Sequence, residues 1–115
     1  RAIDSIAEAA RGAEELARRG IETVVITLGE RGAVAATDEG LYHVPPLPVR
    51  VVNTAGAGDA FNAGMIQARL HGEGWEEALR WAAAVATAVL LTPGTGEVRP
   101  EDARALYTRV TVRRL

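Results

Sequence analysis

The stretch IETVVITLG, residues 21–29, decides the fold class. From Ile21 to Leu28 it is rich in β-branched residues and nearly continuously apolar, which predicts a strand buried on both faces, as in a parallel sheet. The residues before it predict a helix of about four turns, because Ser5 and Glu8 form a capping box and apolar residues follow at helical spacing. A helix followed by a buried strand indicates an α/β fold.

Downstream of this strand, the sequence predicts a sheet edge and then helices. A tight turn, GERG, at residues 29–32 leads to two short strands joined at residues 38–40, which we expect to be antiparallel additions at the sheet edge. The PPLP segment, residues 45–48, crosses the surface to a short strand at residues 49–52. The first of the later helices is apolar enough to be packed inside. These helices are expected over residues 57–70, 75–91 and about 100–109.

Composition narrows the class of protein. A chain of 115 residues predicts one domain with one compact layer of structure. A net charge of -2 gives no basic surface for nucleic acid, so small molecules are the expected partners. The absence of cysteine favours the cytoplasm. Because the chain begins with Arg1 and has no leader, we expect it to be a piece of a longer protein. Its longest apolar run, residues 81–92, is shorter than the roughly 18 residues of a membrane span.

Few reactive side chains remain for chemistry. All thirteen cationic residues are arginine, which excludes a Schiff-base lysine and a Walker-type phosphate loop. The single serine, Ser5, lies in a helix cap, which argues against a serine hydrolase. His43 and His71 have no acidic neighbours at ligand spacing, so we expect solvated histidines and assign no metal site. Carboxylate and threonine groups are left as candidates.

The segment TAGAGDAFNAG, residues 54–64, is the candidate functional loop. It is not a dinucleotide-binding fingerprint, because Phe61 stands where a third glycine is needed. A general anion site at the start of a helix remains, since small residues admit a ligand close to the unpaired N–H groups. Asp59 then has two interpretations. It is either a helix-terminus acid worth about 0.3–1 kcal/mol, or a buried general base beside a phosphoryl group.

A longer match favours the general base. The segment NTAGAGDAFNAGMI, residues 53–66, resembles the second signature of the ribokinase-type (PfkB) carbohydrate kinases. VVITLGERGAV, residues 24–34, resembles the nucleotide-binding strand and turn of that family, and LLTPGTGEV, residues 90–98, resembles its loop near the adenine. The resemblance covers nearly the whole chain. It implies that residues 1–115 are the C-terminal part of a ribokinase-like three-layer αβα fold, without the N-terminal sugar-binding part.

The resemblance also implies roles for individual residues. Asp59 corresponds to the catalytic base, and the small residues before it, Gly56, Ala57 and Gly58, correspond to the anion hole. Ala83 falls where some members place a polar side chain beside the adenine, which implies apolar packing of the base. The nucleotide-contacting set is Thr27, Leu28, Gly29, Glu30, Arg31 and Gly32, together with Gly58 and Asp59.

Taken with the resemblance, the sequence predicts ATP-dependent phosphoryl transfer to a hydroxyl of a sugar or sugar phosphate, with Mg²⁺. The branch most similar is that of 1-phosphofructokinase and tagatose-6-phosphate kinase, which implies a hexose phosphate such as fructose 1-phosphate. We expect the isolated chain to be inactive and the full-length protein to form a homodimer. The alternatives are a non-catalytic nucleotide-binding module, a structural fragment, and a free-sugar or nucleoside kinase of the same family.

Overall fold

The chain folds into two compact units in a computed structural model that describes residues 5–20, 23–28, 31–49, 56–91 and 99–115. The first unit comprises Arg1–Pro46 and Val112–Leu115, and the second comprises Leu47–Thr111. The expectation of one compact layer is therefore wrong. Two separate sets of elements pack among themselves, one a helix on a sheet and the other a group of helices, and each set has its own buried residues.

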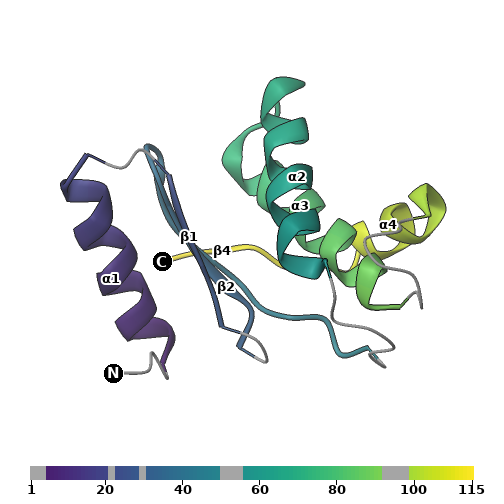
Figure 1. The fold of residues 1–115 in the computed structure, drawn as a ribbon, viewed down its shortest axis with the longest axis horizontal. Helices are drawn as coiled ribbons and strands as arrows, with labels where there is room; N and C mark the ends of the chain where they lie inside the picture. Colours follow the sequence, from purple (N-terminus) through teal and green to yellow (C-terminus); the bar gives the residue numbers. More distant parts are fainter. Residues whose placement is uncertain (1–4, 21–22, 29–30, 50–55, 92–98) are drawn as a thin grey trace. The chain divides into compact units, whose positions relative to one another are not determined.

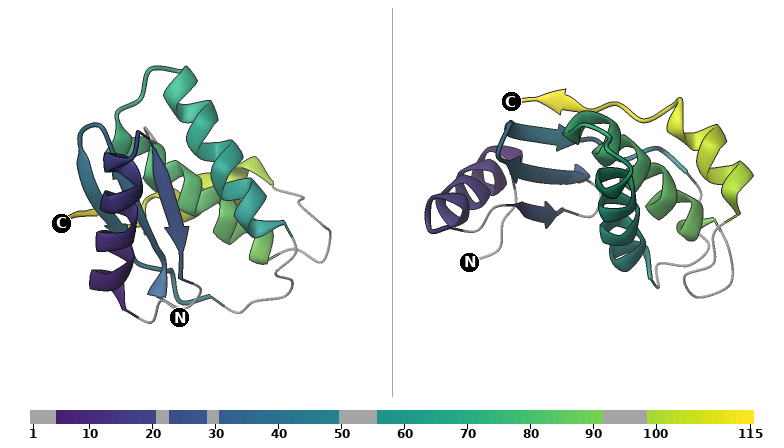
Figure 2. Two further views of the ribbon diagram at one scale, coloured as in Figure 1. Left: turned by 60° about the vertical axis from the view of Figure 1, so that its left-hand side comes forward. Right: turned by 90° about the horizontal axis from the view of Figure 1, so that it is seen from above.

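The first unit is a four-stranded antiparallel sheet with a helix on one face (Figures 1 and 2). The strand order is β1-β2-β3-β4, so each strand pairs with its neighbours in the chain. The helix α1 buries Ala9 and Ala13 completely against sheet residues that include Val34. The elements of this unit are α1 (Ile6–Arg18), β1 (Val24–Thr27), β2 (Ala33–Thr37), β3 (Gly40–Val44) and β4 (Arg113–Arg114).

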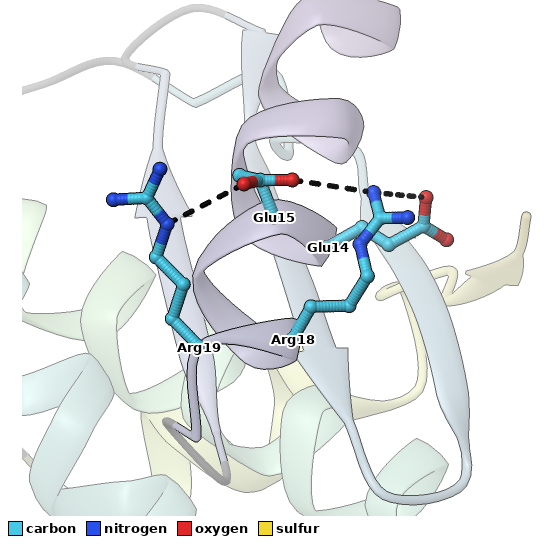
Figure 3. A network of polar contacts seen from close by, with 4 residues as sticks. All are labelled: Glu14, Glu15, Arg18 and Arg19. Carbon is cyan, nitrogen blue, oxygen red and sulfur yellow. Dashed lines mark hydrogen bonds and ion pairs between the residues drawn. The ribbon is translucent and has the colours of Figure 1, made fainter.

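Helix α1 begins where the capping box predicts. The Ser5 hydroxyl accepts a hydrogen bond from the backbone N–H of Glu8 at 3.1 Å, which satisfies one of the free donors of the first turn. Near the other end, Glu15 lies between Arg18 and Arg19, at 3.5 and 3.4 Å, and Figure 3 shows this network on the solvent side. These side chains are all more than half exposed, so each pair contributes only about 0.3–0.5 kcal/mol.

Strand β1 differs from the expectation. It pairs antiparallel with β2, Thr27 opposite Ala33, and among its four residues only Val24 is buried. The expectation of a parallel strand buried on both faces is therefore wrong for this chain. The turn after β1 reverses the chain into β2, and β2 is the one strand that pairs with β1 among the described residues. The second hairpin, between β2 and β3, is confirmed, with turn residues 38–39.

The described residues of the second unit form three helices, with α3 in contact with both others. Gly64 of α2 permits a close approach, because a Cβ atom there would lie 3.3 Å from the Cα of Ala82 in α3. Val49 is not in a strand, and the other three residues of the strand expected at 49–52 lie outside the described part of the chain. The helices are α2 (Ala57–Leu70), α3 (Trp75–Leu90) and α4 (Pro100–Tyr107), close to the predicted ranges.

Helix α2 has the predicted ends but not the predicted burial. It buries Phe61, Gly64 and Ala68, whereas Ile66 and Leu70 are 55% and 82% exposed. The expectation of a helix packed inside is therefore wrong. The helix is apolar on most sides, but in the described part of the chain only the face toward α3 is covered. None of the described helices is long and apolar enough to cross a membrane.

Candidate functional site

The N-terminus of α2 leaves backbone donors free. Gly56 precedes the helix in the left-handed conformation, with φ +83°, which glycine adopts without strain. Among the described residues, no side chain caps this helix end. The Gly56 carbonyl accepts the first helical bond, from the N–H of Ala60 at 2.9 Å. The N–H groups of the three residues between them have no intrahelical acceptor, so this end of the helix is suited to an anion.

Gly58, the second residue of α2, is exposed and has open space where a side chain would be. A Cβ atom built there would meet nothing within 4 Å. Packing among the described residues therefore does not require glycine at this position. A ligand that approaches the backbone closely would require it.

Asp59 is the third residue of α2 and lies in the same turn as the free N–H groups. Its side chain is exposed, so the expectation of a buried aspartate is wrong. The reason is that α2 turns this position away from the α3-facing row of Phe61 and Gly64. An exposed carboxylate here is open to a ligand from solvent, but it is equally compatible with a helix-terminus acid worth about 0.3–1 kcal/mol. The preceding residues 50–55 lie outside the described part of the chain.

The predicted nucleotide turn joins β1 to β2 in the first unit. Leu28 donates its N–H to the Gly32 carbonyl at 2.7 Å, and Arg31 donates to the Leu28 carbonyl at 3.1 Å. Thr27 ends β1 with an exposed side chain. The structure thus brings together four of the six predicted residues of the turn, while residues 29–30 lie outside the described part of the chain. Gly56 to Asp59 belong to the second unit.

The sequence of this chain, compared with known proteins, matches the pfkB family of carbohydrate kinases over residues 1–102. The chain belongs to the pfkB family. It is 40% identical to a 1-phosphofructokinase of Haloferax volcanii over 112 residues, which is 97% of this chain and 37% of that protein.

Two solved pfkB-type structures are also similar. Phosphofructokinase-2 from Escherichia coli in complex with potassium has a TM-score of 0.85 at 28% identity, over 95% of this chain and 36% of that one. Ribokinase from Thermotoga maritima has a TM-score of 0.77 at 27% identity, over 86% of this chain and 34% of that one. The pfkB chain thus has part of the ribokinase-like αβα fold, and it spans about a third of the length of these relatives.

Sequence reasoning missed one residue of this pfkB chain. His43 was expected to be solvated, but it is 2% exposed, because it lies on the same face of the sheet as its partner Val34, the face that α1 covers. Its ring contacts the carbonyl of Arg31 in the predicted nucleotide turn, at 2.9 Å from Nε2. The alternation of LYHV, residues 41–44, places His43 on the same face as the α1-packed Leu41, and this was the available signal. His71 is exposed at the end of α2, as expected.

Two further features of the second unit lie away from the pfkB signature. Ala83 is half-buried in α3, and its carbonyl accepts a bond from the Thr87 hydroxyl at 2.7 Å. The loop expected near the adenine, residues 92–98, lies outside the described part of the chain. A hollow of about 350 Å³ lies toward the C-terminal end of α2, where Tyr107 donates its hydroxyl to Glu77. Its lining residues are Gln67, Ala68, His71, Glu73, Glu77, Trp81 and Tyr107.

Proposed function

We propose that the whole protein transfers the γ-phosphoryl group of ATP to a hydroxyl of a sugar or sugar phosphate, with a hexose phosphate such as fructose 1-phosphate as the favoured acceptor. One observation carries the proposal: in a pfkB-family chain, the first turn of one helix holds a carboxylate and three N–H groups with no acceptor in the described part of the chain. The names of the relatives, 1-phosphofructokinase and phosphofructokinase-2, support a sugar phosphate as the acceptor.

The start of α2 supplies the electrostatic part of the proposed mechanism. The transferred phosphoryl group gathers negative charge on its oxygens, and the N–H groups of Ala57 and Gly58 would donate to them. Gly56 begins the helix with no side-chain cap from the described residues, and the open space at Gly58 allows an oxygen close to the backbone. The helix dipole adds roughly half a positive charge at this end.

Asp59 supplies the proton transfer. Its carboxylate would accept the proton of the attacking hydroxyl as the new O–P bond forms and the bond between the γ-phosphorus and the leaving ADP oxygen breaks. The exposure of Asp59 in this chain leaves it accessible to an acceptor hydroxyl. Because a carboxylate has the same sign of charge as the phosphates, the expected contact of Asp59 with the nucleotide adds little to ATP affinity, and its main role concerns the acceptor.

The turn at residues 27–32 would hold the nucleotide, with apolar contacts near Ala83 for the adenine. Mg²⁺ fits this chain as an ion carried by the ATP phosphates and water, since Mg²⁺ sites in such enzymes need only one or two carboxylates besides the substrate. The described residues contain no group of three His, Cys, Asp or Glu that could hold a metal by itself. When bound, the ion neutralises phosphate charge.

An Asp59→Asn substitution in the whole protein tests the proposal. We expect kcat to fall by roughly a hundredfold to ten-thousandfold, while the Kd for Mg·ATP stays within about twofold. Asp102→Asn is the matched control, because Asp102 is likewise the third residue of its helix, α4, and it should leave kcat unchanged. Steady-state kinetics with fructose 1-phosphate and calorimetric titration with Mg·ATP measure the two quantities.

The exposure of Asp59 favours a second candidate, a non-catalytic nucleotide-binding module in which Asp59 only stabilises the helix end. In that case Asp59→Asn would lower the melting temperature slightly, Mg·ATP would still bind, and no acceptor sugar in a panel would be phosphorylated by the wild-type protein. Because the acceptor-binding part of the family is expected upstream, we expect the 115-residue chain alone to lack activity in either case.

A further inference from the structure

A chain of polar contacts passes through the buried ring of His43. On one side, Nε2 lies 2.9 Å from the carbonyl oxygen of Arg31 in the turn between β1 and β2. On the other side, Nδ1 lies 2.6 Å from the guanidinium of Arg113 in β4. His43 and Arg113 are direct partners in the register of β3 and β4, which explains why their side chains meet.

The two partners determine the state of the ring. A guanidinium group has donors and no acceptor, and a carbonyl oxygen is an acceptor only. Nδ1 must therefore be unprotonated and accept from Arg113, and Nε2 must carry the hydrogen and donate to Arg31. The Nδ1–H tautomer and the charged ring would both place an N–H against the guanidinium. The neutral Nε2–H tautomer is the one state that satisfies both contacts, and its bond from Arg113 is charge-assisted.

The hydrogen bond from His43 links the turn between β1 and β2 to strand β3. The turn has two backbone bonds of its own, between Leu28 and Gly32 and between Arg31 and Leu28. It also packs tightly against the end of β3, since a Cβ atom at Gly32 would lie 2.0 Å from the Val44 carbonyl oxygen. His43 precedes Val44 and ties the Arg31 peptide to the same strand. The Arg31 peptide is thus held by a buried side chain of β3.

We propose that His43 is a positioning residue for ATP binding: in its Nε2–H tautomer it fixes the Arg31 carbonyl and hence the described residues of the turn, 27–28 and 31–32, and Arg113 selects that tautomer. The inference rests on the proposed function, because it assumes that this turn contacts the nucleotide. It adds a role for β4, whose Arg113 lies beyond residues 1–102 matched by the family.

Two substitutions in the whole protein separate positioning from packing. In His43→Gln the side-chain amide can place an N–H donor near the former Nε2, whereas in His43→Asn the shorter amide can replace only Nδ1. We expect His43→Asn to raise the Kd for Mg·ATP about three- to tenfold, the cost of one hydrogen bond, and His43→Gln to change it less than about twofold. His71→Asn is the control, since His71 is exposed at the end of α2 and should leave the Kd unchanged.

Nitrogen-15 NMR of the wild-type imidazoles gives a readout that needs neither nucleotide nor a variant. We expect His43 to show a protonated Nε2 and an unprotonated Nδ1. In Arg113→Met, which keeps the aliphatic length and removes the donors, we expect this tautomer to lose its dominance and the Kd for Mg·ATP to rise about two- to fivefold. A dominant Nδ1–H tautomer in the wild-type protein would overturn the inference even if every His43 variant failed to fold.

The binding results distinguish the two proposals. If the wild-type protein does not bind Mg·ATP, the proposed function is wrong and the inference falls with it. If the wild-type protein binds and the Asn and Gln variants have equal Kd values, His43 is only a packing residue, and the proposed function is not contradicted. A selective loss in His43→Asn, with similar melting temperatures for the two variants, supports positioning.

Discussion

Each of the two predicted loops contains more than one glycine, and one glycine from each, Gly32 and Gly58, can be compared because their surroundings are opposite. Gly32, in the turn after β1, has φ +86°, and a Cβ atom there would lie 2.0 Å from the backbone oxygen of Val44. Gly58, at the start of α2, lies in a regular helix, and a Cβ atom there would meet nothing within 4 Å. The fold itself requires the first glycine, whereas nothing in the described part of the chain requires the second.

Because of this difference, the two glycines are not equally good indications of a bound ligand. A glycine that the backbone needs carries no information about a ligand, because it would be present in a protein without one. A glycine inside a helix costs up to about 1 kcal/mol relative to alanine, and without a structural reason a glycine in a helical position points to a bound group. The α2 start is therefore the stronger indication of a phosphate site, and the β1–β2 turn depends on the family match.

Replacing Gly32 should have the largest effect on folding. We expect Gly32→Ala to lower the free energy of unfolding by at least about 3 kcal/mol, from the left-handed backbone and the contact with Val44 together. Gly20→Ala is the matched control, because Gly20 has φ +99° and nothing within 4 Å, so only about 1 kcal/mol of backbone strain is expected. Urea denaturation measures both. Equal losses in the two variants would mean that the backbone near Val44 shifts at no cost. The close contact at Gly32 would then contribute nothing to the requirement for glycine.

Replacing Gly58 should stabilise the protein, in contrast to replacing Gly32. We expect Gly58→Ala to raise the free energy of unfolding by about 0.4–1 kcal/mol, and to weaken Mg·ATP binding about tenfold, because the added methyl group occupies space beside the N–H donors. Gly74→Ala, also in open space but before α3, should leave nucleotide affinity unchanged. Thermal unfolding and calorimetry supply the two numbers. Undiminished affinity in Gly58→Ala would remove the argument that a ligand uses this space.

The smallest effect is expected on the outer face of α1. Glu15→Gln removes the carboxylate that lies between Arg18 and Arg19, and we expect it to lower the free energy of unfolding by less than about 0.5 kcal/mol at low salt. In roughly 1 M salt the loss should vanish, since exposed charges are screened. Nucleotide affinity should not change. A loss as large as that of Gly32→Ala would show that even surface substitutions in the first unit are strongly destabilising. The loss in Gly32→Ala would then no longer indicate a special packing contact.

Local features were predictable from the residues alone. The start of α1 follows from Ser5 and Glu8, and the N–H of Glu8 does bond the Ser5 hydroxyl. The range of α2 and the β2–β3 hairpin were also predicted, because caps, turns and periodicity depend on neighbours in the chain. The positions of Gly56 and Asp59 at the start of a helix belong to the same class. Their catalytic roles stay predictions that rest on the resemblance to the family.

Burial was not predictable in the same way. The strand at β1 was expected to be covered on both faces, α2 and Asp59 to be inside, and His43 to be in water, and all of these expectations were wrong. Apolar composition indicates that a segment can be buried. Which of its faces are covered depends on the other elements that pack against it. In the described part of the chain those elements are α3 for α2, and β2 for β1.

The sequence by itself thus determined the family, the helices, the hairpins and the placement of small residues and an acid at one helix start. Only the tertiary structure decided that Gly32 is needed by the fold, that Gly58 is not, and that His43 joins the nucleotide turn to β4. The physical reason is distance along the chain. His43 bonds Arg31, twelve residues away, and Arg113, seventy residues away, and contacts of that separation exist only once the sheet has formed.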